Sequence, residues 1–246
     1  EDPSGLKSKQ FLRPASTRGD FRFARRASLF LSERGTDMSF SIRRLRSADL
    51  PVATRLWRTE FGAPADTVQS WLSAAINPRF ATAGFAAVPT DAHPANDDAD
   101  GPALVGLGIT EIGRRRYTRE YLGLDVLDVD LDLHARNGIF HLCVVAPAWR
   151  RCGVATALYR HRLNDLAARG MQRIVGISWN RTHAPDSRAL FDAYGFRRVA
   201  TVRRFYARTT PRKRCPDCGG ACLCTASIHV RDGGAPSSTP VASPDA

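Results

Sequence analysis

Residues 140–157, FHLCVVAPAWRRCGVATA, constrain the fold of this chain more than any other stretch. An apolar run typical of a buried strand ends at Pro147, which has no backbone N–H with which to continue a ladder. A basic turn follows, and Gly153 then opens a helical pattern. The first turn of a helix has unpaired N–H groups that attract phosphate oxygens. The stretch therefore predicts a phosphate-binding turn between a strand and a helix.

Patterns on both sides of this turn predict further strands and helices. The alternation over residues 128–134 is typical of a half-exposed strand, whose aspartates either form an exposed polar face or bind a cation. Together the patterns predict an α/β (α+β) protein with one main domain. Strands are expected over residues 41–45, 80–88, 104–112, 139–145, 173–179 and 196–207, and helices from Pro51 and over residues 66–76, 152–168 and 186–193.

The side chains around the turn suit an anion. Arg150 and Arg151 contribute positive charge, and Thr156 contributes a hydroxyl. Gly153 and Ala155 leave space for a phosphate to approach the backbone. A glycine before a helix is common by itself, so this pattern gains specificity only from the elements around it.

Those elements follow in a definite order: a strand, a short helix, and Tyr194-Gly195-Phe196 before another strand. With R-x-x-G-x-A at residues 150–155, this order resembles the acetyl-CoA signature of the GNAT superfamily of N-acetyltransferases, over roughly residues 41–207. The resemblance implies the GNAT fold, a mixed and mostly antiparallel central sheet flanked by helices, with pantetheine between a diverging fourth and fifth strand. It also implies that acetyl-CoA is bound by Cys143, Val144, Val145, Arg150, Arg151, Cys152, Gly153, Val154, Ala155, Thr156 and Asn180.

Acetyl transfer to an amine requires a base for the ammonium and a donor for the departing thiolate. Period two predicts that His141 shares a strand face with Cys143 and Val145. His141 is therefore either the base, directly or through water, or a hydrogen-bonded core histidine. The family's acid is a tyrosine four residues before the Gly-Phe glycine, where this chain has Phe191. Tyr194 is the substitute acid or a packing residue, and Cys143 and Cys152 are packing residues or acyl carriers.

A cysteine cluster forms a second specific motif. Cys215-Pro-Asp-Cys218-Gly is the tight turn of a zinc knuckle, in which backbone N–H groups point at sulfur. Cys222 and Cys224 would complete a four-sulfur structural zinc site, with His229 as a spare ligand. Free or reversibly oxidised thiols and an iron–sulfur cluster are the alternatives.

Charge and composition divide the chain into four parts. Residues 1–46 carry a net charge of +6, half of the +12 of the whole chain, and residues 203–214 add six basic residues and no acidic one. These basic segments are either solvated or attract nucleic acid or an acidic protein. We expect a disordered basic arm over residues 1–40, the acetyltransferase domain over 41–210, a small C-terminal cysteine-rich module over 211–232, and a disordered tail over 233–246.

The function expected from these features is transfer of an acetyl group from acetyl-CoA to a primary amine by a GNAT-type acyltransferase. The alternative is a catalytically weak acyl-CoA-binding module that recruits a protein or nucleic acid through its basic, cysteine-rich C-terminus. No apolar run is long enough for a membrane span, and the clustered cysteines favour a reducing cytoplasm. A monomer or a homodimer is expected. The acceptor stays open among small amines, antibiotics, peptide N-termini and lysine.

Overall fold

The computed structural model describes residues 38–77, 81–90, 104–181, 186–209 and 215–233. The chain divides into two compact units, Glu1–Asp37 and Met38–Ala246, and all described residues belong to the second. The expected basic arm before Met38, the basic linker 210–214 and the tail from residue 234 lie outside the described residues. No helix in the described part of the chain has the length and apolarity that crossing a membrane requires.

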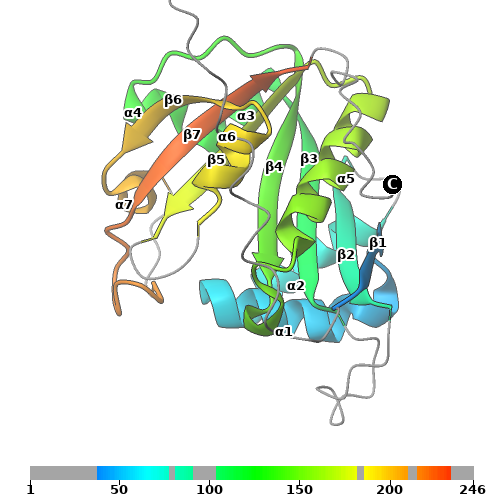
Figure 1. Ribbon diagram of the computed structural model, residues 1–246. Helices are drawn as coiled ribbons and strands as arrows, with labels where there is room; N and C mark the ends of the chain where they lie inside the picture. Colours follow the sequence, from blue (N-terminus) through cyan, green and yellow to red (C-terminus); the bar gives the residue numbers. More distant parts are fainter. Residues whose placement is uncertain (1–37, 78–80, 91–103, 182–185, 210–214, 234–246) are drawn as a thin grey trace, which may run out of the picture. The chain divides into compact units, whose positions relative to one another are not determined.

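A seven-stranded sheet in the order β1-β2-β3-β4-β5-β7-β6 forms the centre of this unit (Figure 1). All neighbouring strands are antiparallel except β4 and β5, which are parallel. The predicted mixed, mostly antiparallel sheet is therefore confirmed. The strands are β1 (Phe40–Arg44), β2 (Ala83–Pro89), β3 (Gly106–Arg114), β4 (Arg136–Val145), β5 (Arg173–Asn180), β6 (Arg197–Val202) and β7 (Thr225–Asp232).

Helices cover both faces of the sheet because each has one apolar stripe. On one face, α1 (Leu50–Phe61) and α2 (Ala65–Ile76) bury residues such as Trp57 and Leu72 against β3 and β4. On the other face, α5 (Val154–Ala168) lies in front of β3 and β4 in Figure 1. A glycine in β3 allows α5 to approach the sheet closely, since a Cβ at Gly106 would lie only 2.8 Å from the Val154 side chain. The short α6 (Arg188–Ala193) buries Phe191 on this same face.

The segment between β3 and β4 differs from the prediction. It contains α3 (Arg115–Leu122) and α4 (Leu124–Leu127), and the expected strand over residues 128–134 has no regular structure. Leu131 and Leu133 are buried, so the alternation correctly indicated which side chains of this segment face the core. A strand must also pair with another strand, and alternation records only that one side of a segment is buried. Residues 128–134 cannot pair with β3, because β2 and β4 already occupy both of its edges.

The end of the chain differs more. The expected strand over residues 196–207 is divided into β6 and the short helix α7 (Phe205–Thr209), with Arg204 in a left-handed conformation between them. The sheet then gains β7, which lies between β5 and β6 (Figure 1). The predicted domain boundary at residue 210 must therefore be corrected. The cysteines lie in the connection between two strands of the domain, and not in a module after it.

Candidate functional site

β4 and β5 diverge after a short paired region. Only Gly138, Ile139 and Phe140 of β4 pair with β5, at Ile174, Val175 and Gly176. β4 continues to Val145 and β5 to Asn180, so each strand has an unpaired edge along the gap between them. An unpaired edge offers backbone N–H and C=O groups to an extended ligand. The gap is the place where the resemblance to the GNAT signature implies that pantetheine binds.

The free end of β4 leads into the predicted phosphate turn. After Val145 come the short 3₁₀ helix η3 (Pro147–Trp149) and a turn in which Arg151 and Gly153 have φ angles of 66° and 81°. Apart from the two neighbouring residues, no atom of the described residues lies within 4 Å of a Cβ built on Gly153, so among these residues the approach to the first turn of α5 is open. Arg151, Cys152 and Thr156 are exposed around it. The backbone here can receive an anion as the sequence predicts.

Two predicted cofactor residues of this turn face the protein interior. Val154 is buried and packs with Trp149 under the turn. Arg150 points inward, where its Nη2 lies 2.6 Å from Glu60 Oε2 and its Nε donates to the Val145 carbonyl at 3.3 Å. Arg150 thus closes part of the β4 edge and joins the turn to α1.

A β-bulge decides where His141 points. The register of β3 and β4 shifts between Ile109 and Thr110, which pair with Leu142 and Phe140, so His141 is the extra residue. The buried Arg162 of α5 donates to the Ile109 carbonyl at 2.9 Å, next to the bulge.

The bulge corrects the prediction that His141 shares a face with Cys143 and Val145. Cys143 and Val145 pack on the α5 side of the sheet. The His141 ring instead contacts aromatic rings of α1, α2 and α3, on the opposite side. Its centroid lies 3.8 Å from the ring of Trp71, 5.5 Å from that of Tyr121 and 6.3 Å from that of Trp57.

The sequence interpretation missed Tyr121, whose ring contacts that of His141, and Glu111, whose charge acts on Tyr121. Burial raises the pKa of Tyr121, so its phenol keeps its proton at neutral pH. Burial also raises the pKa of Glu111, although the hydrogen bond from Tyr117 at 2.9 Å acts against this shift. Perturbed titratable groups beside a cleft are candidates for acid–base roles. Tyr121 was missed because the sequence patterns assigned no helix or strand to the residues between 112 and 128, where the structure has α3.

The β4 residues after the bulge pack as core groups on both sides of the sheet, with Cys143 on the α5 side. Cys143 is half-buried, and burial raises the pKa of its thiol. Val144 is buried on the α1–α2 side. A protonated, packed thiol fits the interpretation of Cys143 as a packing residue.

The helix α6 brings Phe191 and Tyr194 to this side. Phe191 is buried, and its ring stacks on that of His229 with a centroid distance of 4.4 Å. The Tyr194 hydroxyl donates to the Thr156 carbonyl at 2.7 Å, which ties α6 to the first turn of α5. Tyr194 and His141 lie on opposite sides of the sheet, and the role of Tyr194 as an acid stays a prediction.

Asn180 belongs to a chain of polar side chains along β5 and β7. Ser178 donates to Asn180 Oδ1 at 3.1 Å, and Asn180 Nδ2 donates to Ser227 at 3.0 Å. Ser178 also lies 3.0 Å from His229 Nε2. Burial lowers the pKa of His229 to about 4, so the ring is neutral at pH 7. These bonds hold Asn180 at the end of β5 beside the gap.

The four cysteines of the β6–β7 connection converge. All four sulfur atoms of Cys215, Cys218, Cys222 and Cys224 lie within 4.8 Å of one another. Cys224 Sγ is 3.4 Å from Cys218 Sγ and 3.7 Å from Cys215 Sγ. A tetrahedron with zinc–sulfur bonds of 2.3 Å has edges of about 3.8 Å, so the donor set fits a Zn²⁺ ion.

The thiols of this cluster differ in pKa: burial raises the pKa of Cys222 and Cys224, whereas the pKa of Cys215 is lowered. Burial raises the pKa of Cys215, but backbone N–H groups of Cys218 and Asp217 outweigh it and the pKa is lowered. The Leu223 N–H donates to Cys218 Sγ at 3.5 Å. His229 is not a ligand, because it is buried between Ser178 and Phe191 on β7 and lies outside the group of converging sulfurs.

Part of the chain matches the sequence model of a known protein family. Residues 95–196 match the model of the family described as Acetyltransferase (GNAT) family. No curated protein sequence matches the chain.

Solved structures share the fold at low sequence identity. NAA60 from Arabidopsis thaliana in complex with acetyl-CoA aligns with a TM-score of 0.56 and 14% identity, over 79% of this chain and 98% of that chain. The ribosomal-protein-S18-alanine N-acetyltransferase from Escherichia coli aligns with a TM-score of 0.50 and 19% identity, over 80% and 98%. A GNAT family acetyltransferase from Elizabethkingia anophelis with acetyl-CoA bound aligns with a TM-score of 0.50 and 11% identity, over 79% of this chain and 98% of that chain. The predicted GNAT fold is thereby confirmed.

Proposed function

We propose that this chain, which carries a GNAT acetyltransferase domain, transfers the acetyl group of acetyl-CoA to a primary amine. One observation carries the proposal: the gap between β4 and β5 runs directly into the unobstructed turn at Gly153. The unpaired strand edges would bind the pantetheine amides, and the first N–H groups of α5 would bind the pyrophosphate. The side chain of Arg151 is exposed beside that turn and would add positive charge.

The proposed chemistry takes place where the gap meets the face that carries His141. The amine nitrogen attacks the thioester carbonyl, the carbon–sulfur bond breaks, and the ammonium loses a proton. His141 would accept that proton directly or through water, since the ordinary pKa of histidine suits proton transfer near neutral pH. Tyr121 contacts the His141 ring and stays protonated, so it is better placed than Tyr194 to donate to the departing thiolate.

The alternative function rests on Phe191. A buried phenylalanine stands where the family has its acid, and its ring is held against His229. A chain without an effective acid would bind acetyl-CoA and turn over slowly. An amine screen separates the two functions: acetyl-CoA binding without release of coenzyme A for any amine would favour the binding module.

The cofactor site is tested by Gly153→Glu. The new side chain would fill the open space and place a negative charge at the turn, so acetyl-CoA affinity should fall at least about tenfold. Gly170→Glu is the matched control, because Gly170 follows α5, also has a positive φ, and also has no atom of a described, non-neighbouring residue within 4 Å of its Cβ position. Binding is measured by calorimetry and coenzyme A release by thiol detection. Equal affinity of Gly153→Glu and the parent would contradict the proposed site.

The four cysteines would bind one structural zinc ion. The proposal is supported by the sulfur distances and by the N–H groups directed at Cys215 and Cys218. Zinc bound to four thiolates supplies folding free energy to its loop. Thiolates persist in a reducing compartment, which supports a cytoplasmic location.

A further inference from the structure

A chain of ion pairs connects the cysteine cluster to the phosphate turn. Asp217, within the knuckle, accepts hydrogen bonds from Arg181 Nε at 2.9 Å and Nη2 at 2.5 Å. Arg181 Nη1 lies 3.9 Å from Glu60 Oε2, and Arg150 Nη2 lies 2.6 Å from the same oxygen. The side chains of Arg181, Asp217 and Glu60 are each 12–13% exposed, so solvent screens these pairs less than surface pairs.

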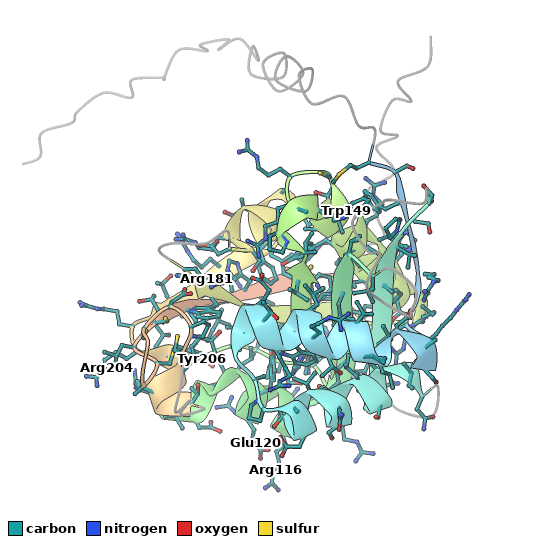
Figure 2. All side chains as sticks on the ribbon, turned by 90° about the horizontal axis from the view of Figure 1, so that it is seen from below. Arg116, Glu120, Trp149, Arg181, Arg204 and Tyr206 are labelled. Carbon is teal, nitrogen blue, oxygen red and sulfur yellow. The ribbon has the colours of Figure 1, made fainter. Side chains whose placement is uncertain are left out.

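Apolar contacts hold the same elements together. Phe61, at the end of α1, packs on Trp179 of β5 with ring centroids 5.9 Å apart. Trp179 belongs to one buried cluster with Cys215 and Cys222. Pro216 lies 3.6 Å from a Cβ built on Gly62, which ends α1. Figure 2 shows Arg181 and Tyr206 beside this end of α1.

The connected groups belong to two different sites. Arg150 is the first residue of the phosphate turn and also bonds to Val145, at the end of the unpaired β4 edge. Asp217 lies between two cysteines of the cluster. The ion pairs through Arg181 and Glu60 therefore form a continuous path of contacts from the knuckle to Arg150 in the phosphate turn.

We propose that zinc binding at Cys215, Cys218, Cys222 and Cys224 increases acetyl-CoA affinity through the chain Asp217–Arg181–Glu60–Arg150. This inference rests on the proposed acetyl-CoA site. Zinc fixes the knuckle and hence Asp217, which holds Arg181 at the end of β5. Arg181 and Arg150 then share Glu60, so the phosphate turn is ordered before the ligand arrives, and preorganisation strengthens binding. Because coupling is reciprocal, acetyl-CoA also increases zinc affinity.

The experiment uses the full chain under reducing conditions. Zinc is removed with a chelator, metal content is measured by elemental analysis, and acetyl-CoA affinity is measured by calorimetry with and without one equivalent of Zn²⁺. We expect one zinc per chain and an acetyl-CoA affinity about five- to tenfold higher in the zinc-loaded protein. Absence of stoichiometric zinc, or equal affinity in both forms, would overturn the inference.

The variant Asp217→Asn tests the coupling even if the protein unfolds when zinc is removed. This variant retains all four cysteines and weakens the contact with Arg181, so it should bind one zinc while its acetyl-CoA affinity falls about five- to tenfold at saturating zinc. Asp125→Asn is the matched control, since Asp125 forms an exposed ion pair with Arg119 on α3. A zinc-loaded Asp217→Asn protein with parental acetyl-CoA affinity would refute the coupling.

The same measurements separate this inference from the proposed function. If both metal forms of the parent bind acetyl-CoA equally and Gly153→Glu does not bind, the acetyl-CoA site stands and the coupling is refuted. If neither metal form binds acetyl-CoA, the proposed function itself fails.

Discussion

At the scale of single residues, His141 has the most unusual environment in the site. Its ring lies among Trp57, Trp71 and Tyr121 because the bulge in β4 turns it to the α1–α2 side. On that side it faces the region between the first two helices and α3, away from the turn that would bind the pyrophosphate. A base on the side opposite the phosphate turn can receive an amine that enters separately from acetyl-CoA.

His141→Gln tests the role of this residue. If His141 is the base, kcat should fall about 10²- to 10⁴-fold and the acidic limb of the pH–rate profile should disappear, while acetyl-CoA affinity is unchanged. His161→Gln, an exposed change on α5, is the control. A kcat within about threefold of the parent, with the same pH profile, would leave His141 as a core histidine.

At the scale of elements, the position of α6 depends on a glycine in β5, Gly176, which has no side chain to obstruct it. A Cβ at Gly176 would lie 2.6 Å from the Phe191 ring, closer than atoms can approach. Gly176 is also the last residue of β5 that pairs with β4. The same glycine therefore permits the close approach of α6 at the point where the gap begins.

Gly176→Ala should destabilise the fold by about 1–3 kcal/mol, because Phe191 is enclosed by other rings and cannot move away freely. Urea unfolding followed by fluorescence measures the change. Gly220→Ala is the control, since within the described part of the chain its Cβ position has only its two neighbouring residues within 4 Å. An unchanged midpoint for Gly176→Ala would show that α6 can shift at no cost.

At the scale of the whole molecule, β7 joins β5 to β6 and carries the buried His229. Burial lowers the pKa of His229 to about 4, while an unfolded histidine titrates near 6.5. Between these values the unfolded chain binds more protons than the folded chain, so stability rises with pH. The contribution is fully present above about pH 6.5 and is lost as the pH falls toward about 4.

Comparison with His229→Gln isolates this contribution. The parent should lose about 1–3 kcal/mol more free energy of unfolding than the variant between pH 6.5 and about 4. The carboxylates and thiols are the same in both proteins, so their contributions to the pH dependence cancel when the two free energies of unfolding are subtracted. Parallel stability curves for the two proteins across this range would contradict the assignment.

The sequence by itself determined the features whose physics is local. The strand, turn and helix around Gly153 follow from periodicity and from the space that a glycine leaves, and the convergence of Cys215 and Cys218 follows from their spacing. Local patterns record which residues are buried and where the backbone can turn. They therefore indicated a phosphate-binding turn in an α/β protein without any knowledge of distant contacts, and the resemblance of this turn and its neighbours to the GNAT signature implied the GNAT fold and acetyl-CoA.

Only the tertiary structure decided the rest. The bulge at His141 depends on register with β3, and the place of β7 depends on two strands that precede it in the chain. The pairing of Arg150 with Glu60 joins residues far apart in sequence, on different elements. Period-two alternation is the same for every pairing partner and assumes a strand without bulges, so it placed His141 on the wrong face. The change of composition after Tyr206 does not record that the chain returns to the sheet as β7, so it placed the cysteines outside the domain.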